Sequence, residues 1–206
     1  MWSRWRRGWG KRSAIGWAEL AKPNTRRDDG CMDYRRSRQA GGTYFFTVNL
    51  AERSGKLLVD RVEDLRRSVR TVKERHPFDV LAWVVLPDHL HAIWALPADD
   101  GDCATRWMLI KSGFSRCIEK GERLRASRIR KRERGIWQRR FWEHLITDAD
   151  DLHRHVDYVH INPVKHGYVE CASNWPYSSI HRYIRLGRVS KDWAAPPGNG
   201  FEVGEK

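Results

Sequence analysis

The stretch that decides the fold is Phe78–Leu96, FDVLAWVVLPDHLHAIWAL. It consists of two apolar runs of strand length on either side of the turn pair Pro87-Asp88, a pattern typical of a β-hairpin. The second run holds His89 and His91, and residues two apart in a strand project from the same face. We therefore expect a central hairpin that presents two imidazoles side by side.

Further elements follow on both sides of this hairpin. The stretch TYFFTVNL at 43–50 is rich in β-branched and aromatic residues and predicts a strand. Elsewhere apolar residues recur at helical spacing, and Asp148 and Gly167 suit the two ends of the last helix. The predicted elements are strands at 43–50, 78–86, 89–96 and 136–146, and helices at 60–76, 105–119 and 148–167.

The order of these elements, β-α-β-β-α-β-α, indicates an α+β fold of the ferredoxin-like split βαβ type. We expect an antiparallel four-stranded sheet with its helices on one face. Residues 32–170 are predicted to form this domain, and residues 171–206 a C-terminal extension that is partly disordered. Residues 1–31 combine scattered tryptophans with basic residues at no regular period and end in a turn-rich segment, which indicates a disordered basic N-terminal extension.

The charge balance points to a polyanionic partner. The chain has 39 Lys+Arg against 26 Asp+Glu, a formal net charge of +13, which favours nucleic acid. No stretch approaches the roughly 20 apolar residues of a membrane-spanning helix, so we expect no membrane partner. Cys31, Cys103, Cys117 and Cys171 form no CxxC pair, and no apolar signal segment is found, which together predict reduced thiols and a cytoplasmic location.

His89 and His91 on one strand face are half of a metal site, although a structural histidine pair is the commoner reason for this pattern. The last predicted helix adds Tyr158 and Asn162, which are four residues apart and share a helix face. Two imidazoles and one amide oxygen would suit Mg²⁺ or Mn²⁺ and leave positions open for a phosphodiester oxygen. Tyr158 would then be the nucleophile; the alternative is a tyrosine that only packs in the core.

Several basic residues could contact DNA phosphates, with neighbouring aromatic rings stacking on unpaired bases. The alternative interpretation is a solvated charged surface. The candidates are Arg35, Arg36, Arg38, Lys111, Arg116, Arg130, Arg132, Arg139, Arg140, Lys165 and His166.

Five ordered motifs carry a resemblance to a known family: GGTYFFTVNL at 41–50, LPDHLHAIWALP at 86–97, ERGIWQRRFWEHLI at 133–146, DYVHINPVKHG at 157–167 and WPYSS at 175–179. Together they resemble the REP-associated tyrosine transposases, relatives of the single-tyrosine HUH transposases. The resemblance runs from about residue 32 to residue 193.

The resemblance implies that His89 and His91 are the HUH metal ligands and that Tyr158 is the nucleophile. Asn162 falls where these enzymes place a third ligand, with His155, His160 and His166 as nearby alternatives.

The implied reaction is cleavage of single-stranded DNA at REP-type hairpins. By resemblance, the tyrosine hydroxyl attacks phosphorus to give a 5′-phosphotyrosine and a free 3′-OH, and another 3′-OH reverses the step to join strands. The resemblance leaves open whether the chain acts as a monomer or a homodimer. A hypothesis of another class is a non-catalytic module that binds structured DNA or RNA on its sheet. The presence of His89, His91 and Tyr158 together favours the enzyme.

Overall fold

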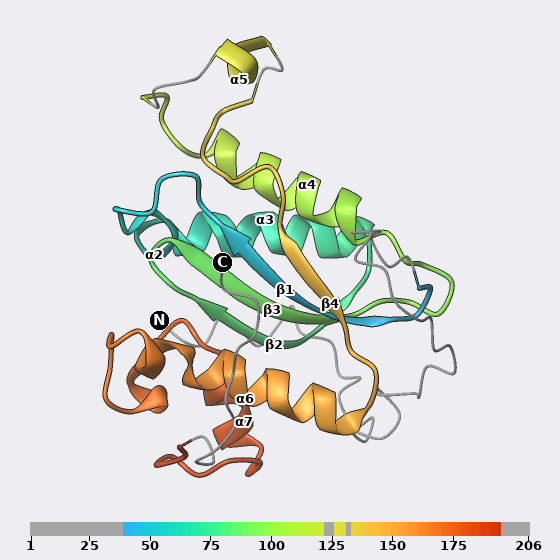
Figure 1. The fold of residues 1–206 in the computed structure, drawn as a ribbon, viewed down its shortest axis with the longest axis vertical. Helices are drawn as coiled ribbons and strands as arrows, with labels where there is room; N and C mark the ends of the chain where they lie inside the picture. Colours follow the sequence, from blue (N-terminus) through green and yellow to red (C-terminus); the bar gives the residue numbers. More distant parts are fainter. Residues whose placement is uncertain (1–38, 122–125, 131–132, 195–206) are drawn as a thin grey trace, which may run out of the picture.

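The computed structural model describes residues 39–121, 126–130 and 133–194. Its centre is a four-stranded antiparallel sheet in the order β2-β3-β1-β4, which is the ferredoxin-like order (Figure 1). The predicted α+β fold class is therefore confirmed. The strands are β1 (Thr43–Asn49), β2 (Asp79–Val85), β3 (His89–Ala95) and β4 (Trp142–Leu145).

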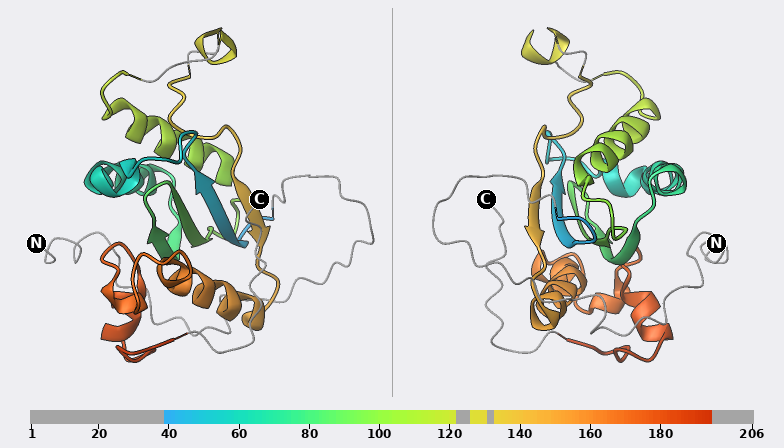
Figure 2. Two further views of the ribbon diagram at one scale, coloured as in Figure 1. Left: turned by 60° about the vertical axis from the view of Figure 1, so that its left-hand side comes forward. Right: turned by 90° about the vertical axis from the view of Figure 1, so that its right-hand side faces the viewer.

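The helices cover both faces of this sheet (Figures 1 and 2). On one face lie α3 and α4, whose apolar stripes pack on alternate residues of β1 and β3. On the other face lies α6, followed by a 3₁₀ turn and α7. The helices are α2 (Leu57–Asp60), α3 (Val62–Arg75), α4 (Cys103–Arg116), α5 (Ala126–Arg130), α6 (Ala149–Lys165), the 3₁₀ turn η2 (Ala172–Asn174) and α7 (Ile180–Arg185).

The expectation that the helices share one face is wrong. The first two helices are crossovers between strands of the sheet and do lie together. Because α6 follows the last strand, no further strand constrains its side, and its buried Leu152, Val156 and Val159 pack against Phe45 and Ile93 on the opposite face. Each face of the sheet therefore has its own apolar core.

Strand β1 divides its side chains between the two cores. Phe45 belongs to the core under α6, whereas Phe46 contacts Trp94 and Trp107 in the core under α3 and α4. This alternation follows from the pleat of a strand. Leu90, between the two histidines of β3, lies in the α3–α4 core, so the histidines face α6.

Some predicted boundaries differ from the observed ones. The helix predicted at 60–76 corresponds to α3, and the short helix α2, which was not predicted, precedes it and is separated from it by Arg61. The strand predicted at 136–146 pairs with β1 only over Trp142–Leu145, with a single bridge from Trp137 to Leu50 before it. The ends of α6 match the prediction, because Asp148 accepts a hydrogen bond from Asp151 N–H and Gly167 follows with φ of +70°.

The segment after α6 packs on the edge of β2. Ser178 bridges Val84, the backbone N–H of Val85 donates to Tyr177 O at 2.9 Å, and Tyr183 is buried in the α6 core. Residues 171–194 thus pack on the domain, although the predicted boundary made them an extension. The predicted extension at 1–31, the last twelve residues of the chain, and Arg35, Arg36, Arg38 and Arg132 lie outside the described residues. Among the helices described, none is long and apolar enough to cross a bilayer.

Candidate active site

The two histidines of β3 lie side by side beneath α6. The rings of His89 and His91 are 5.0 Å apart and nearly perpendicular, and both side chains are buried. Their shared face is the arrangement that the strand spacing predicts.

His89 is held by a carboxylate from the hairpin turn. Its Nδ1 lies 2.8 Å from Asp88 Oδ1, and Arg53 Nε donates to Asp88 Oδ2 at 2.6 Å. Burial acts to raise the pKa of the Asp88 carboxyl, but the hydrogen bonds and charges of His89 and Arg53 outweigh it and hold that pKa well below its ordinary value. Asp88 is therefore an anion at neutral pH, and the proton of a neutral His89 ring belongs on Nδ1. The buried Nε2 atom has no hydrogen-bonding partner among the described residues.

His91 is held by the neighbouring strand. Its Nδ1 lies 2.9 Å from Oγ1 of Thr47, the residue directly opposite it in the β1–β3 register. Phe45, two residues earlier on the same face of β1, stacks on the imidazole with ring centroids 5.5 Å apart. A hydrogen bond at one ring edge and a stacked phenyl ring together fix the orientation of His91.

Helix α6 brings Tyr158 and Asn162 to the histidines. The Tyr158 ring is fully buried and its centroid lies 5.1 Å from that of His91. His166, two helical turns further along α6, lies 5.2 Å from His89 between ring centroids. Asn162 is midway between Tyr158 and His166 on the same helical face, and it is fully buried.

The Asn162 amide is the second unsatisfied polar group at this place. Within the part of the chain that the structure describes, neither Oδ1 nor Nδ2 has a hydrogen-bonding partner. A buried polar group without a partner costs about 1–3 kcal/mol. The Asn162 amide and His89 Nε2 therefore indicate that a ligand completes this site.

The other two histidines considered as third ligands point elsewhere. His160 Nε2 lies 3.0 Å from Ser179 Oγ and its ring packs on Tyr183, in the C-terminal segment. Burial lowers the pKa of His160 to about 3, so this ring is neutral. His155 faces β4, where its ring stacks on His144 with centroids 4.7 Å apart, and its Nδ1 lies 3.0 Å from Oδ1 of Asp151, one turn earlier on α6. Of the three alternatives, only His166 contacts the histidine pair.

Comparison with known proteins identifies the family. A REP-associated tyrosine transposase of Escherichia coli (strain K12) is 43% identical to this chain over 174 residues, which are 84% of this chain and 97% of the relative. This chain belongs to the REP-associated tyrosine transposases. A relative from Haemophilus influenzae, whose name carries the same family designation, is 44% identical over 166 residues, which are 80% of this chain and 94% of the relative. No family model matches the chain.

A solved structure agrees with this membership. It is described as a REP-associated tyrosine transposase bound to a REP hairpin, and it matches this chain with a TM-score of 0.74 and 43% identity. The match covers 85% of this chain and 98% of that chain. The resemblance drawn from the five motifs is thereby confirmed.

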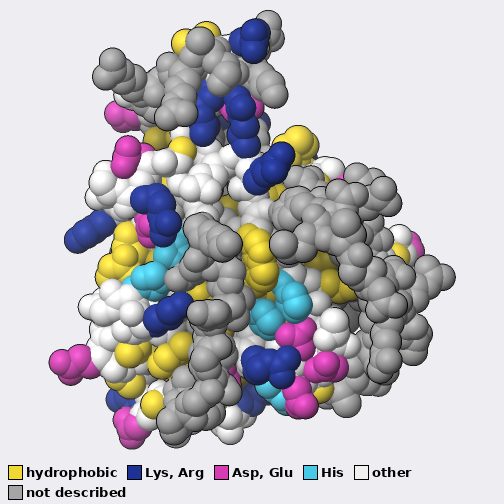
Figure 3. Space-filling view, in the orientation of Figure 1, with side chains coloured by type: hydrophobic (Ala, Val, Ile, Leu, Met, Phe, Trp, Pro, Cys, Tyr) yellow, Lys and Arg dark blue, Asp and Glu magenta, His cyan; other side chains and the backbone are white. Residues whose placement is uncertain are grey.

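Those basic residues predicted to contact DNA that the structure describes lie in two places in this transposase. Lys165 and His166 are exposed at the end of α6, and Lys165 Nζ lies 5.0 Å from the centre of the Tyr158 ring. The others lie on or beside α4, α5 and β4, the end of the molecule over which Lys and Arg side chains gather in Figure 3. Three of these have contacts within the protein: Lys111 Nζ donates to Gln138 O at 3.0 Å, Arg139 forms an ion pair with Glu133, and Arg116 donates to Ser112 Oγ at 3.2 Å. The remaining ones described are Arg130 and Arg140.

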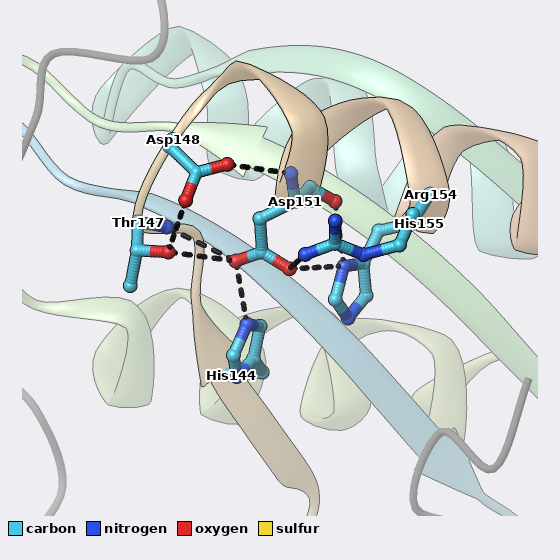
Figure 4. A network of polar contacts seen from close by, with 6 residues as sticks. All are labelled: His144, Thr147, Asp148, Asp151, Arg154 and His155. Carbon is cyan, nitrogen blue, oxygen red and sulfur yellow. Dashed lines mark hydrogen bonds and ion pairs between the residues drawn. The ribbon is translucent and has the colours of Figure 1, made fainter.

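A second cluster of ionisable side chains joins β4 to the start of α6 (Figure 4). The Asp151 carboxylate lies 2.8 Å from His144 Nε2, accepts from Thr147 N–H at 3.0 Å and faces His155 Nδ1. The ligand atoms of His144, Asp151 and His155 lie within 4.8 Å of one another, a grouping that can hold a metal ion. Sequence analysis missed this cluster. The sequence shows that Asp151 and His155 are four residues apart and so share a helical face. That His144 joins them could not be predicted, because it depends on how α6 packs beside β4.

We expect the protein to lose stability as the pH falls below about 6.5, the ordinary histidine pKa. Burial holds the pKa of His155 below that value, so the unfolded chain binds a proton that the folded chain does not. The contribution of neutral His155 to the free energy of unfolding is therefore complete above the unfolded-state pKa. Below that pH the contribution decreases, by at most about 1.4 kcal/mol per pH unit. Urea unfolding across this range measures the slope, which should be shallower in His155→Gln. Equal slopes in the two proteins would contradict the prediction.

Proposed function

We propose that this chain is a metal-dependent endonuclease and strand transferase that acts on single-stranded DNA at REP-type hairpins through a 5′-phosphotyrosine. The observation that carries the proposal is the Tyr158 ring 5.1 Å from His91, on the helical face that also carries the unsatisfied Asn162 amide. A 43% identical relative whose solved structure is bound to a REP hairpin supports the substrate class. We place the activity in the cytoplasm, in line with the free thiols of Cys103, Cys117 and Cys171.

His89, His91 and Asn162 would hold a divalent cation. The side chains fit this role because Asp88 accepts a hydrogen bond from His89 Nδ1–H, Thr47 contacts Nδ1 of His91, and the Asn162 amide is buried without a partner in the described chain. Two nitrogen donors and one amide oxygen favour Mg²⁺ or Mn²⁺ with positions left open. When bound, the ion supplies Lewis-acid stabilisation of the charge that develops on the phosphate oxygens.

Tyr158 would be the attacking group. Its hydroxyl oxygen forms a bond to the scissile phosphorus while the bond from phosphorus to the 3′ oxygen breaks, and the leaving 3′ oxygen takes up a proton. The hydroxyl proton must leave, and Lys165 places a positive charge 5.0 Å from the ring that becomes anionic. Attack by another 3′-OH reverses the step and joins strands. All these side chains come from one chain, so we expect a monomer to carry a complete site.

The test is capture of the covalent intermediate. The full chain is incubated with labelled single-stranded DNA that carries a REP-type hairpin and unpaired flanks, with Mg²⁺ or Mn²⁺ or with EDTA. We expect a protein–DNA adduct on a denaturing gel, formed only when the metal is present. Mass spectrometry of the tryptic digest should find the DNA attached to Tyr158 through its 5′-phosphate. Hairpin binding without an adduct, across a range of flanking sequences, would instead support the non-catalytic binding module.

Thr47→Val should weaken binding of Mn²⁺ by roughly 10- to 100-fold, the usual effect of removing a partner that orients a metal-binding histidine. Valine keeps the shape of the side chain but removes the 2.9 Å contact with His91 Nδ1. Calorimetric titration of the DNA-free protein with Mn²⁺ measures the change. Thr43→Val is the matched control, because Thr43 is a buried threonine on the same face of β1 that lies opposite Ala95. Equal affinity of the two variants would exclude Thr47 as a positioning residue.

A further inference from the structure

A row of aromatic rings leads from the histidine pair to the surface. The His166 ring lies 5.2 Å from His89, Tyr168 follows 6.0 Å from His166 at an interplanar angle of 29°, and Trp175 lies 5.3 Å from Tyr168 at 27°. Tyr168 is 43% exposed. The other large hydrophobic side chains exposed in the described residues are Met108, Ile129 and Leu186, and no ring or hydrogen-bond contact links them to the histidines.

The backbone holds Tyr168 in a fixed place. The N–H of Gly167 donates to Val164 O, and the N–H of Tyr168 donates to Pro163 O, both at 2.9 Å. With Gly167 at φ of +70°, this pair of hydrogen bonds is the Schellman arrangement that ends a helix. The helix end therefore presents the Tyr168 ring with little conformational freedom left to lose on binding.

Charged side chains lie near this ring. The pKa of the Tyr168 hydroxyl is raised by burial and by the Asp88 carboxylate, while Arg53 opposes the shift, so both charges act on this ring. The Arg53 side chain is about half exposed, and the exposed Lys165 lies three residues before Tyr168. A flat exposed ring with cations beside it matches an unpaired nucleotide, whose base offers a π-face and whose phosphate is an anion.

We infer that Tyr168 is the stacking platform for an unpaired base of the single-stranded DNA next to the phosphate that Tyr158 attacks. This inference rests on the proposed function and adds a residue that positions the substrate. A base in the paired stem already has its faces covered by its neighbours, so the occupant is a base of the unpaired flank. Arg53 and Lys165 would supply the positive charge for the backbone phosphates next to that base.

The test separates stacking from chemistry by working in EDTA. Oligonucleotides with a REP-type hairpin carry 2-aminopurine at one unpaired flanking position at a time, and the fluorescence change on binding is compared between variants. We expect one position to report stacking in the wild type and in Tyr168→Phe, and to lose that signal in Tyr168→Ala and Tyr168→Leu. Tyr168→Leu retains an apolar side chain without a flat ring, and Leu186→Ala is the control for loss of an exposed apolar residue elsewhere.

Affinities provide the second measurement. Tyr168→Ala should weaken binding of the flanked hairpin by roughly 5- to 100-fold, the range found for loss of one base–aromatic stack, and leave binding of the hairpin without flanks unchanged. Equal losses on both oligonucleotides, or no loss on either, would overturn the inference. The readouts are independent of catalysis: a wild type that forms no adduct with metal present would contradict the proposed function and leave the fluorescence result in EDTA unaffected.

Discussion

Tyr158→Phe is expected to lower adduct formation by at least roughly 1,000-fold, because phenylalanine has no oxygen with which to form the bond to phosphorus. The substitution removes one atom from a ring that packs on Phe45 and His91, so the fold and the affinity for the hairpin should persist. Adduct yield on denaturing gels and hairpin binding by gel shift, measured on the same preparation, separate the two effects.

Tyr183→Phe is the matched control for this experiment. Tyr183 is also a buried tyrosine of the α6 core, but its hydroxyl donates to Leu81 O at 3.0 Å. Its loss should cost about 1 kcal/mol of stability and leave the adduct yield per folded molecule unchanged. An adduct formed by Tyr158→Phe at the wild-type rate would mean that another residue is the nucleophile.

Phe45→Ala should destabilise the protein by about 3–5 kcal/mol, the usual cost of truncating a fully buried phenylalanine. The Phe45 ring contacts His91, His155 and Tyr158, so the cavity left by the substitution would also release the proposed nucleophile Tyr158 and the proposed metal ligand His91 from their positions. Urea unfolding measures the stability, and adduct formation is measured at a temperature at which the variant is folded.

Phe46→Ala serves as the matched control for Phe45→Ala. Phe46 is equally buried but packs on Trp94 and Trp107 on the other face of β1. We expect a similar loss of stability from this variant and an unchanged rate per folded molecule. If both variants lost the same fraction of that rate, the effect of Phe45 would be one of general stability and not of position.

The local patterns of the sequence were sufficient to predict the main helices and strands and to place the two histidines on one face of their strand. The period of two in the second run of Phe78–Leu96 predicts that His89 and His91 share a face, and the Asp148 cap and Gly167 stop bound the last helix correctly. Such patterns depend on neighbours along the chain. They do not determine which face of a finished sheet each helix covers, and the expectation that all the helices share one face was therefore wrong, although α6 does lie on the face that bears the histidines.

The residues that orient the site were missed for the same reason. Thr47 supports His91 only because the β1–β3 register places it opposite, and a sequence pattern does not determine register. Tyr168 gave no periodic signal, since it stands three residues after the end of α6, and its ring stacking depends on where His166 and Trp175 lie in the fold. Asp88 was visible as a turn residue, but its bond to His89 requires the folded turn.

Because helices cover both faces of the sheet, β1 has no solvent-facing side. From Thr43 to Val48 every residue is buried, so a polar–apolar alternation does not specify the register of this strand. A deletion or insertion of one residue within β1 would exchange the two faces, moving Phe45 and Thr47 into the α3–α4 core and away from the histidines. The exposed residues 51–56 that follow β1 carry no such constraint. Insertions and deletions among relatives should therefore be found in that loop and not in β1. Within the strand, inserting or deleting one residue would remove stability and catalysis together.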